Sequence, residues 1–521
     1  MVDDAAALVD AARGRHAAGQ FGPAARLALE AGEAAKAAGD VDALIAATLV
    51  DEGIPDAATA PIAEQLARDA LALVVGADDP SVRARLLAQR SIALHHREDF
   101  AESAADAEAA MQSAAASAAP EALIAALNAQ ILAISGSDPG PLIPELAGRM
   151  LAAATAAAST NGELFARSWL IAAAMREADL GTVAHEVDSL DVLAARSGGA
   201  PLVAWNATLA RAGLDHARGR FDDAEAGARA ARTILPVTQR HQTEPLFIAQ
   251  LMLLATDRGI EPPEIAIARG VAVGAPVIRA VMTARYDLEM GDRVAAQATF
   301  EALRPRLAGV AMDRRGAPAL VAGVELAVAF GDRAVAEELH ARLEPYADRM
   351  VASAIGAVGP VAHFLGRVET LLGRHAEAVS HADKAAMLAA HGGFGPWHAR
   401  ARLGLAEALA ARGAAGDLPR ARHIATLVRA SAGHLGMTRL RDRASAMGQA
   451  LDPARRLSAR EREIAALIAA GTSNRGIADA LGLSERTIET HVQHILTKLD
   501  LHARTQVAAW AVESQLVVDP G

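Results

Sequence analysis

Residues 473–498 read SNRGIADALGLSERTIETHVQHILTK, two helix-like halves joined by Leu481-Gly482-Leu483-Ser484. Glycine ends a helix readily because it adopts positive φ, and serine accepts the free N–H groups at the start of the next helix. Helix, short turn, helix is the plan of the helix-turn-helix motif, whose second helix enters the major groove of DNA. The polar side of residues 485–499 is therefore the first candidate functional surface.

The second half of this stretch has one apolar and one polar side. At 100° per residue, the apolar residues that share one narrow arc are Ile488, Val492, Ile495 and Leu499. The opposite side carries Arg486, Thr490, Gln493 and Thr497, flanked by Glu489 and His494. Glutamine and threonine both donate and accept hydrogen bonds, and a carboxylate can accept from cytosine N4. We interpret this side as base-reading; a solvated helix face is the alternative.

Further helix signals surround the motif. Ser458 and Glu461 have the spacing of a capping box, which predicts a helix from about Ala459 to Ala470, ended by Gly471. A fourth helix is expected from Ala503 to about Ser514. Pro453 interrupts whatever helix precedes it. The sequence thus predicts a four-helix domain over residues 458–521, preceded by a linker over 449–457.

Composition restricts the rest of the chain. Hydrophobic residues make up 52% of the 521 residues and aromatic residues only 3%, so packing must rely on Ala, Leu and Val, which favours closely spaced helices. The chain has no cysteine, which excludes disulfides, thiolate zinc sites and cysteine nucleophiles and fits a reducing interior. The N-terminus, MVDDAAALVD, is acidic where a signal peptide is basic. We therefore expect a cytoplasmic protein.

The charge is unevenly distributed. The net charge is -11, yet the part from Arg455 onward holds equal numbers of basic and acidic residues. Any DNA contact is therefore expected only in this neutral C-terminal part. The longest uncharged run, residues 350–366, contains Gly359-Pro360, and we expect a buried helix pair broken there and no membrane span.

Residues 1–448 carry a recurring signal. Five turn glycines are each followed, five residues later, by alanine; the glycines are Gly19, Gly219, Gly291, Gly331 and Gly373, and a weaker copy begins at Glu98. Their steps approximate multiples of about 40 residues, which is typical of helix-hairpin repeats. The sequence therefore predicts an all-α fold, and residues 1–448 resemble a tetratricopeptide-like solenoid, in which each repeat is expected to contact only its neighbours. Its concave groove could hold a ligand or a protein partner; a spacer without a ligand is the alternative.

The sequence argues against nucleotide hydrolysis. A phosphate-binding loop needs a Gly-Lys-Ser/Thr run. The three lysines are preceded by Ala, Asp and Thr: Lys36, Lys384 and Lys498. We therefore expect no enzyme and no cofactor.

Two stretches resemble known families. Residues 457–517, with the ordered motifs LSARE and GTSNRGIADALGLSERTIETHVQHILTKL, resemble the LuxR/NarL-type helix-turn-helix along its whole length. Residues 359–447, including GPVAHFLGRVETLLGRHAEAVSHADKAAMLA, resemble the last repeats of large LuxR-type ATPase regulators, here without the ATPase. The resemblance implies a transcription regulator that binds double-stranded operator DNA.

The resemblance also implies roles for single residues. Base contacts fall to Glu489, Thr490 and Gln493, in agreement with the helical wheel. Contacts to the DNA backbone fall to Ser473, Asn474, Arg475, Arg486, Thr487, Thr497, Lys498 and Arg504. The helix from Arg504 to Ser514 would form a homodimer seam. This sequence departs from the family at Gly476, usually Glu or Gln, and at Glu489 and Gln493, where many relatives have Lys or Arg.

Other residues receive structural interpretations. His491 and His494 could ligate a metal, but no third ligand suggests itself, so no metal site is expected. Trp397 and Trp510 are expected to anchor the core. The sequence as a whole predicts a sensing repeat array that controls a C-terminal DNA-binding domain. The alternative is a scaffold or adaptor whose helix-turn-helix no longer binds DNA.

Overall fold

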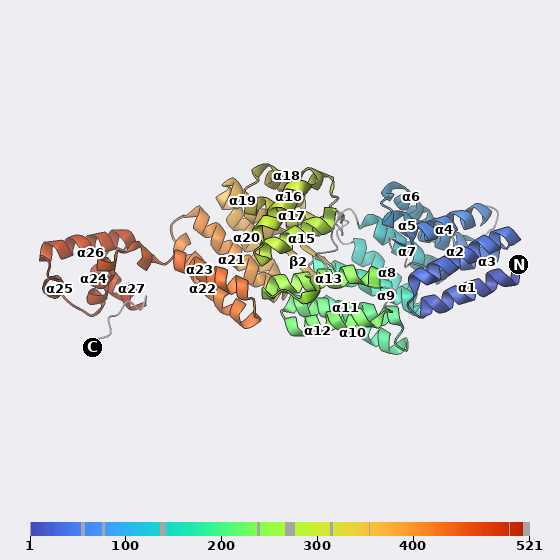
Figure 1. Ribbon diagram of the computed structural model, residues 1–521, viewed down its shortest axis with the longest axis horizontal. Coiled ribbons are helices and arrows are strands. Elements are labelled where there is room, and N and C mark those ends of the chain that lie inside the picture. Colours follow the sequence, from blue (N-terminus) through green and yellow to red (C-terminus); the bar gives the residue numbers. More distant parts are fainter. Residues whose placement is uncertain are drawn as a thin grey trace.

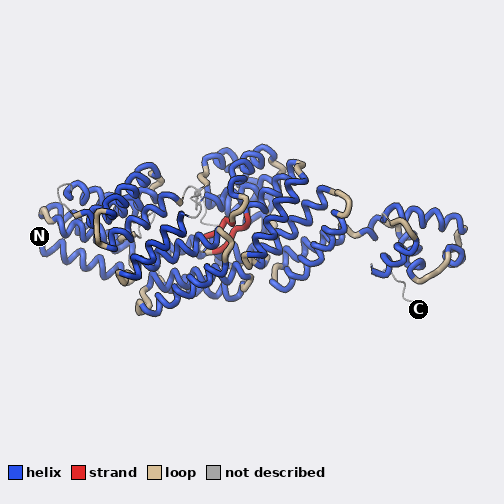
Figure 2. Tube along the Cα trace, turned by 180° about the vertical axis from the view of Figure 1, so that it is seen from behind, coloured by secondary structure: helices blue, strands red, loops and turns tan. Residues whose placement is uncertain are grey.

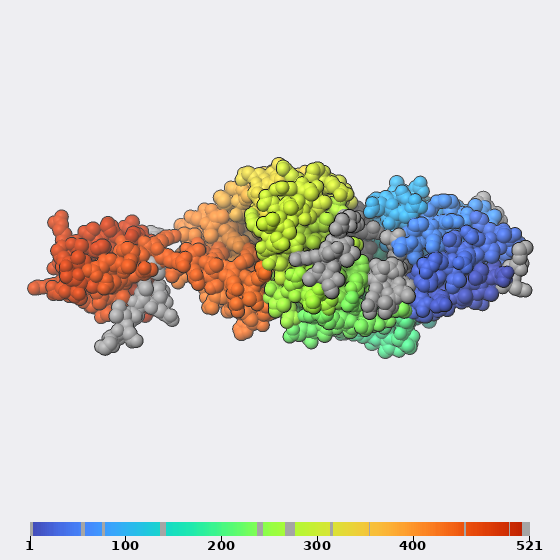
Figure 3. Space-filling view, in the orientation of Figure 1, coloured from blue at the N-terminus to red at the C-terminus, as the bar shows by residue number. Residues whose placement is uncertain are grey.

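The computed structural model describes residues 2–53, 58–74, 79–135, 142–236, 240–265, 277–312, 316–353, 355–499 and 501–513. It is an elongated helical body with the N-terminus at one end and the C-terminal four-helix domain at the other (Figure 1). A narrow neck joins this domain to the array in the space-filling view (Figure 3). The all-α prediction is confirmed, apart from one short β-hairpin.

The first half of the array comprises α1 (Val2–Ala17), α2 (Phe21–Ala38), α3 (Val41–Thr48), η1 (Leu49–Asp51), α4 (Ala60–Val74), α5 (Pro80–His96), α6 (Phe100–Ala115), α7 (Pro120–Ile134), α8 (Leu142–Ala156), α9 (Thr160–Arg176) and α10 (Leu180–Arg196). Consecutive helices pack against each other, as in a solenoid of helix hairpins.

The second half continues with α11 (Pro201–Arg218), α12 (Phe221–Ile234), α13 (Arg240–Arg258), α15 (Val277–Met290), α16 (Arg293–Leu303), η3 (Arg304–Gly309), α17 (Gly316–Phe330), α18 (Arg333–Leu343), η4 (Glu344–Tyr346), β1 (Met350–Ser353), β2 (Gly356–Pro360), α19 (Val361–Leu372), α20 (His375–His391), α21 (Gly395–Arg412), α22 (Asp417–Leu435) and α23 (Thr438–Ala450). A short helix, η5 (Pro453–Arg456), lies in the neck.

The repeat signal marks real turns between helices. All five glycines at the predicted turns have positive φ, from 71° at Gly19 to 96° at Gly291. The five alanines that follow them are fully buried: Ala24, Ala224, Ala296, Ala336 and Ala378. Glu98, with φ 70°, takes the same left-handed conformation in the weaker copy. Ala158 and Ala178 do so as well, with φ 51° and 59°, and because these two turns carry no glycine they do not follow the repeat signal.

The expectation that each repeat contacts only its neighbours is wrong for the second half. Arg400 of α21 donates from Nε to Oδ1 of Asp257 in α13 over 2.7 Å, across 143 residues of sequence. Arg439 of α23 donates to the backbone oxygens of Glu289 and Met290, at 2.9 and 2.7 Å. Helix pairs α11–α21 and α13–α23 also contact each other. The array therefore winds round until distant repeats meet.

The first part of the apolar run over residues 350–366 forms two β-strands, and the rest belongs to helix α19. Met350 pairs with Pro360 and Val351 with Gly359 in an antiparallel hairpin, and α19 begins directly afterwards at Val361. The expected helix pair broken at Gly359-Pro360 is therefore wrong. Gly359 has φ 143°, and a Cβ there would lie 2.6 Å from the Trp397 ring, so only glycine fits. The hairpin lies in the middle of the array (Figure 2). No described helix is both long and apolar enough to cross a membrane.

Asp257 is the centre of a buried polar cluster. It accepts from Arg400, and its Oδ2 lies 2.8 Å from Nε2 of His216. Burial alone would raise the pKa of Asp257, but the attraction of Arg400 and the contact with His216 bring that pKa down to about 2. Arg400 also donates to the backbone oxygen of Thr256 at 3.0 Å. The carboxylate is thus ionised and connects α11, α13 and α21.

The buried pair predicts a large effect of Asp257→Ala. Removing one partner leaves the Arg400 guanidinium charged and buried, which costs about 3–5 kcal/mol of stability. The variant should show a lower urea midpoint by circular dichroism at pH 7. Because the folded pKa lies below the ordinary value of 3.8, this contribution is complete above that value and is lost as the pH falls towards 2.

Asp222→Ala is the matched control. Asp222 pairs with Arg258 over 3.1 Å, but its side chain is 91% exposed. Removing an exposed partner should change the free energy of unfolding by less than about 1 kcal/mol. Equal effects of the two substitutions would contradict the role assigned to the buried pair.

Candidate nucleic-acid interface

Four helices form the C-terminal domain: α24 (Ala459–Ala469), α25 (Asn474–Leu481), α26 (Glu485–Leu499) and α27 (Arg504–Glu513). They match the predicted helices to within one or two residues. Their shared core contains Leu457, Ile464, Ile468, Ile477, Ile488, Val492, Ile495, Val507 and Ala511. The turn between α25 and α26 holds Gly482 at φ 66°, as the motif requires.

The capping box at the start of α24 is present. The Glu461 N–H donates to the Ser458 hydroxyl at 3.2 Å, and the Ser458 N–H donates to Glu461 Oε2 at 2.6 Å. Lys498 near the end of α26 donates from Nζ to both oxygens of Glu461, at 2.8 and 2.7 Å. One carboxylate therefore caps α24 and ties it to α26.

The two sides of α26 are as the helical wheel predicts. Ile488, Val492 and Ile495 are buried, and Leu499 is partly buried in the domain core. The predicted base-contacting residues, Glu489, Thr490 and Gln493, are exposed together on the outer side. The Thr490 hydroxyl donates to the Arg486 backbone oxygen at 3.0 Å, which leaves its lone pairs free to accept. Among the described residues, no hydrogen bond engages the Gln493 amide.

The N-terminus of α25 gathers several of the predicted backbone-contacting residues. Ser473 is exposed and accepts from the Gly476 N–H at 3.1 Å. Asn474 Oδ1 accepts from Arg504 Nη1 at 2.6 Å, and Arg504 also donates to the Thr472 backbone oxygen. Burial lowers the pKa of Arg504. Arg475 extends into solvent beside this group.

The remaining predicted backbone-contacting residues belong to α26. Arg486 and Thr497 are exposed, and the Thr497 hydroxyl donates to the Gln493 backbone oxygen at 3.0 Å. The hydroxyls of Thr487 and Ser484 lie 2.7 Å apart at the start of the helix. Lys498 would have to leave Glu461 to reach a phosphate. Arg475 and Arg486 are therefore the predicted cations most accessible to DNA.

We expected no third metal ligand beside His491 and His494, and this expectation is wrong. Glu461 approaches them, and one ligand atom from each of the three residues lies within 4.8 Å of the others. His491 Nδ1 is buried without a hydrogen-bond partner in the described structure. Glu461 already accepts from Ser458 and Lys498, so a cation would have to compete with the Lys498 ammonium. This cluster could not be recognised in the sequence, because Glu461 lies far from His491 and His494 along the chain and approaches them only in the folded domain.

The predicted dimer seam on α27 stays a prediction. Val507 and Ala511 face the domain core, whereas Val512 is 55% exposed. Ser514, the predicted end of the seam, lies outside the described residues. Trp510 packs partly buried against the domain core, and Trp397 is 5% exposed in the array, so both are anchors as expected.

Glu461→Gln should destabilise this domain by about 1–3 kcal/mol, because a buried charged hydrogen-bonding group is lost from both a cap and an ion pair. Burial raises the pKa of Glu461, but bonds from Lys498 and Ser458 outweigh this and lower it. Its stabilisation is therefore complete above the ordinary value of 4.5 and is lost as the pH falls through the folded pKa. Hydrogen exchange of α24 and α26 at pH 7 measures the effect.

Glu463→Gln is the control for this experiment. Glu463 pairs with Arg460 on the same helix, but its side chain is 47% exposed. Exchange in α24 and α26 should hardly change. Unchanged exchange in Glu461→Gln as well would refute the role of Glu461 as the tie between the two helices.

Comparison with known proteins places the domain in a family. Residues 455–511 match the family of bacterial regulatory proteins, luxR family. The chain is 44% identical over 66 residues to the oxygen regulatory protein NreC of Staphylococcus haemolyticus, covering 13% of this chain and 30% of that protein. It is 47% identical over 60 residues to the uncharacterized transcriptional regulatory protein YhcZ of Bacillus subtilis, covering 12% and 28%. The chain thus spans less than a third of these relatives.

Two solved structures align with nearly the whole chain. A chain from the crystal structure of the APC/C hetero-tetramer Cut9-Hcn1 aligns with 94% of this chain over 90% of its own length, at 13% identity and a TM-score of 0.41. A chain from Naa15/Naa10 bound to HypK-THB aligns over 98% and 91%, at 13% identity and a TM-score of 0.18. The described helices form a tetratricopeptide-like repeat array, and the domain that follows it at the C-terminus is a helix-turn-helix of the luxR family of bacterial regulatory proteins.

Proposed function

We propose that this protein is a sequence-specific transcription regulator that binds operator DNA through α26. The observation that supports this most directly is the exposed side of α26, where Glu489, Thr490 and Gln493 stand together opposite the buried side. Side chains of these types can pair with base edges in the major groove. The glutamine amide pairs with adenine N6 and N7, and the glutamate accepts from cytosine N4.

Contacts to the DNA backbone would hold α26 in register. The N-terminus of α25, where Ser473 and Arg475 lie, suits a phosphate because the first N–H groups of a helix have no partner within the helix. Arg486 lies exposed at the start of α26. Because basic and acidic residues are equal in number in this domain, specific contacts should contribute more to DNA binding than overall electrostatic attraction to the phosphates.

The array would sense a ligand or a protein partner and control the domain through the neck. We further propose that the protein acts in the cytoplasm as a homodimer joined through α27, and the proposal includes no enzymatic step. The alternative is a scaffold whose helix-turn-helix binds protein. The engagement of Lys498 by Glu461 and the carboxylate of Glu489 on the reading side favour that alternative.

Two single substitutions distinguish residues that contact bases from residues that contact the DNA backbone. Gln493→Ala should cost about 1–3 kcal/mol on the operator, relax the preference at one base pair and hardly affect random DNA. Arg475→Ala should weaken binding to both DNAs alike and reduce the slope of log affinity against log salt by about one. Fluorescence anisotropy with labelled duplexes at several salt concentrations measures both.

The contrast between the variants decides the assignment. Thr497→Ala is a control on the same helix. The Thr497 hydroxyl already donates to the Gln493 backbone oxygen, and Thr497 is predicted to contact the DNA backbone and not the bases. This variant should leave base preference unchanged. If Gln493→Ala weakened both DNAs equally while Arg475→Ala changed the preferred sequence, α26 could not be docked as proposed. A complete lack of DNA binding by the folded chain would favour the scaffold.

A further inference from the structure

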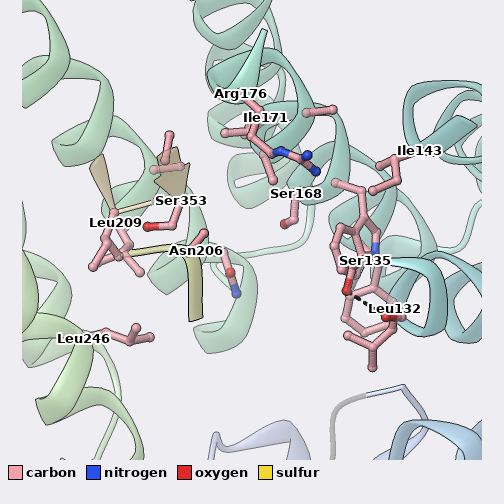
Figure 4. Close-up of a pocket in the computed structure, with 18 of the residues that line it drawn as sticks. Leu132, Ser135, Ile143, Ser168, Ile171, Arg176, Asn206, Leu209, Leu246 and Ser353 are labelled. Carbon is pink, nitrogen blue, oxygen red and sulfur yellow. Dashed lines mark hydrogen bonds between the residues drawn. The ribbon is translucent and has the colours of Figure 1, made fainter. Parts of the chain in front are cut away.

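A cavity of about 450 Å³ lies inside the array, between α9 and α11 and next to the β-hairpin. α7 lines one end of it, and Leu246 of α13 lies on the opposite side (Figure 4). Protein interiors are close-packed and contain few voids larger than a water molecule. Cavities that bind small molecules span about 300–1,000 Å³ and are mostly apolar with a few polar groups. The size of this cavity therefore matches a ligand site and exceeds a packing defect.

The cavity concentrates the scarce aromatic residues of the chain. Only four tryptophans and two tyrosines occur in 521 residues, yet Trp169, Trp205 and Tyr346 all line it, together with Phe165. All four side chains are half-buried. The Trp169 indole N–H donates to Asn128 Oδ1 at 2.9 Å, which fixes the orientation of the ring. Because aromatic rings attract one another face to face with an offset or edge to face, this lining favours a flat aromatic ligand.

The charged side chains of the described lining already have partners. They are Arg176, Glu177 and Arg349, with His96 as a further titratable group. Arg349 forms an ion pair with Glu177, and Arg176 and His96 also have partners in the structure. An ionic ligand would have to displace one of these contacts or lie in the cavity without a counter-charge, which is costly. The lining therefore favours a neutral ligand.

Two polar side chains of the lining offer hydrogen-bond acceptors, one from α9 and one from α11 (Figure 4). The Ser168 hydroxyl donates to the Leu164 backbone oxygen at 2.8 Å, so its lone pairs can accept. Asn206 donates from Nδ2 to the Leu202 backbone oxygen at 2.9 Å, which leaves its Oδ1 as an acceptor. Within the described part of the chain, Asn206 makes no other hydrogen bond. A ligand that carries a donor, such as a hydroxyl group, matches these acceptors.

We infer that this cavity binds a neutral phenol, a flat aromatic molecule whose hydroxyl group donates a hydrogen bond to Asn206 Oδ1. The aromatic residues select the flat body, the acceptors Asn206 and Ser168 select the hydroxyl, and the paired charges disfavour ions. A phenol has an ordinary pKa of about 10, so it is uncharged at neutral pH. The inference rests on the proposed function, because it makes the phenol the signal that the array senses.

The cavity is connected to the neck through the β-hairpin, whose first strand, Met350–Ser353, forms part of the cavity wall. Gln250 of α13 donates from Nε2 to the Ile355 backbone oxygen at 3.1 Å. Trp397 of α21 donates from Nε1 to the Ala357 backbone oxygen at 3.1 Å. α13 in turn contacts α23, the last helix before the neck. A ligand that shifts the hairpin therefore acts on helices that lead to the DNA-binding domain.

Three naphthalene derivatives test the site on the full chain. 2-Naphthol carries a hydroxyl group, 2-methylnaphthalene carries a methyl group of similar size, and 2-naphthoate carries a carboxylate. Equilibrium dialysis at pH 7 measures how tightly each is bound. 2-Naphthol should bind about tenfold more tightly than 2-methylnaphthalene, which is the effect of one hydrogen bond to an otherwise unpaired acceptor. 2-Naphthoate should bind more weakly than both, because its charge would be buried without a partner.

Asn206→Leu tests the acceptor. Leucine keeps the size of the side chain and removes Oδ1, so the variant should bind 2-naphthol about tenfold more weakly and 2-methylnaphthalene with unchanged affinity. Thr208→Val is the matched control on the same helix, because Thr208 also donates to its own helix, to the Ala204 backbone oxygen at 2.8 Å, but lies outside the cavity lining. The control should change neither affinity. An unchanged 2-naphthol affinity in Asn206→Leu, or an equal loss of both probes, overturns the role of Asn206.

Filling variants locate the site. Ser168→Trp from α9 and Ala317→Trp from α17 should each abolish binding of 2-naphthol while circular dichroism stays native; the second variant serves if the first misfolds. Binding that survives in a folded filling variant overturns the assignment to this cavity. If 2-naphthoate binds as tightly as 2-naphthol, the selectivity for a neutral ligand is wrong.

2-Naphthol should also change operator affinity in the wild type and not in the filling variants. An unchanged operator affinity at saturating 2-naphthol refutes the sensing role. Failure of the folded chain to bind DNA without 2-naphthol refutes the proposed function alone, because the pattern of probe binding then still stands. Intact DNA binding together with absent 2-naphthol binding refutes only this inference.

Discussion

The ion pair between Asp257 and Arg400 constrains how the second half of the array is wound, because it joins two buried residues that lie 143 positions apart in the sequence. Both side chains are almost completely buried, at 6% and 9% exposure. A buried charge is tolerated only with a partner, so neither residue can leave this contact without a large cost. The pair therefore fixes α13 against α21, and with them the positions of His216 and Trp397.

The two helices that this contact joins, α13 and α21, also hold the β-hairpin through Gln250 and Trp397. Trp397 holds the hairpin by its indole N–H and leaves room for it only because residue 359 is glycine. The hairpin forms one wall of the cavity, and α23 beside α13 leads to the neck. A strictly linear solenoid would place the cavity and the neck at separate repeats. Winding the array brings the cavity, the ion pair and the neck into one chain of contacts.

The DNA-binding domain was largely predictable from sequence because its determinants are local. The two residues of the capping box, Ser458 and Glu461, lie three positions apart, and the apolar residues of α26 recur every three or four positions. The turn glycines of the array were predictable for the same reason. Ala158 and Ala178 adopt the same conformation without glycine, so their turns gave no signal.

Features made by distant residues could not be predicted. The partners Asp257 and Arg400 carry no common motif, and the cavity draws its aromatic residues from α9, α11 and η4. The apolar run over residues 350–360 has no clear period, so strand and helix could not be told apart. Within the C-terminal domain, the contact of Lys498 with Glu461 could not be predicted either, because the two residues lie 37 positions apart.

The central claim is that the exposed side of α26 reads DNA sequence in the cell. The most direct measurement is genome-wide chromatin immunoprecipitation of the full chain, with a variant altered at both Glu489 and Gln493 as reference. Our account predicts that the wild type recovers sites sharing one sequence, arranged as an inverted repeat, and that the variant loses them while its level stays the same. Recovery of no common sequence, or of the same sites by both proteins, would contradict it.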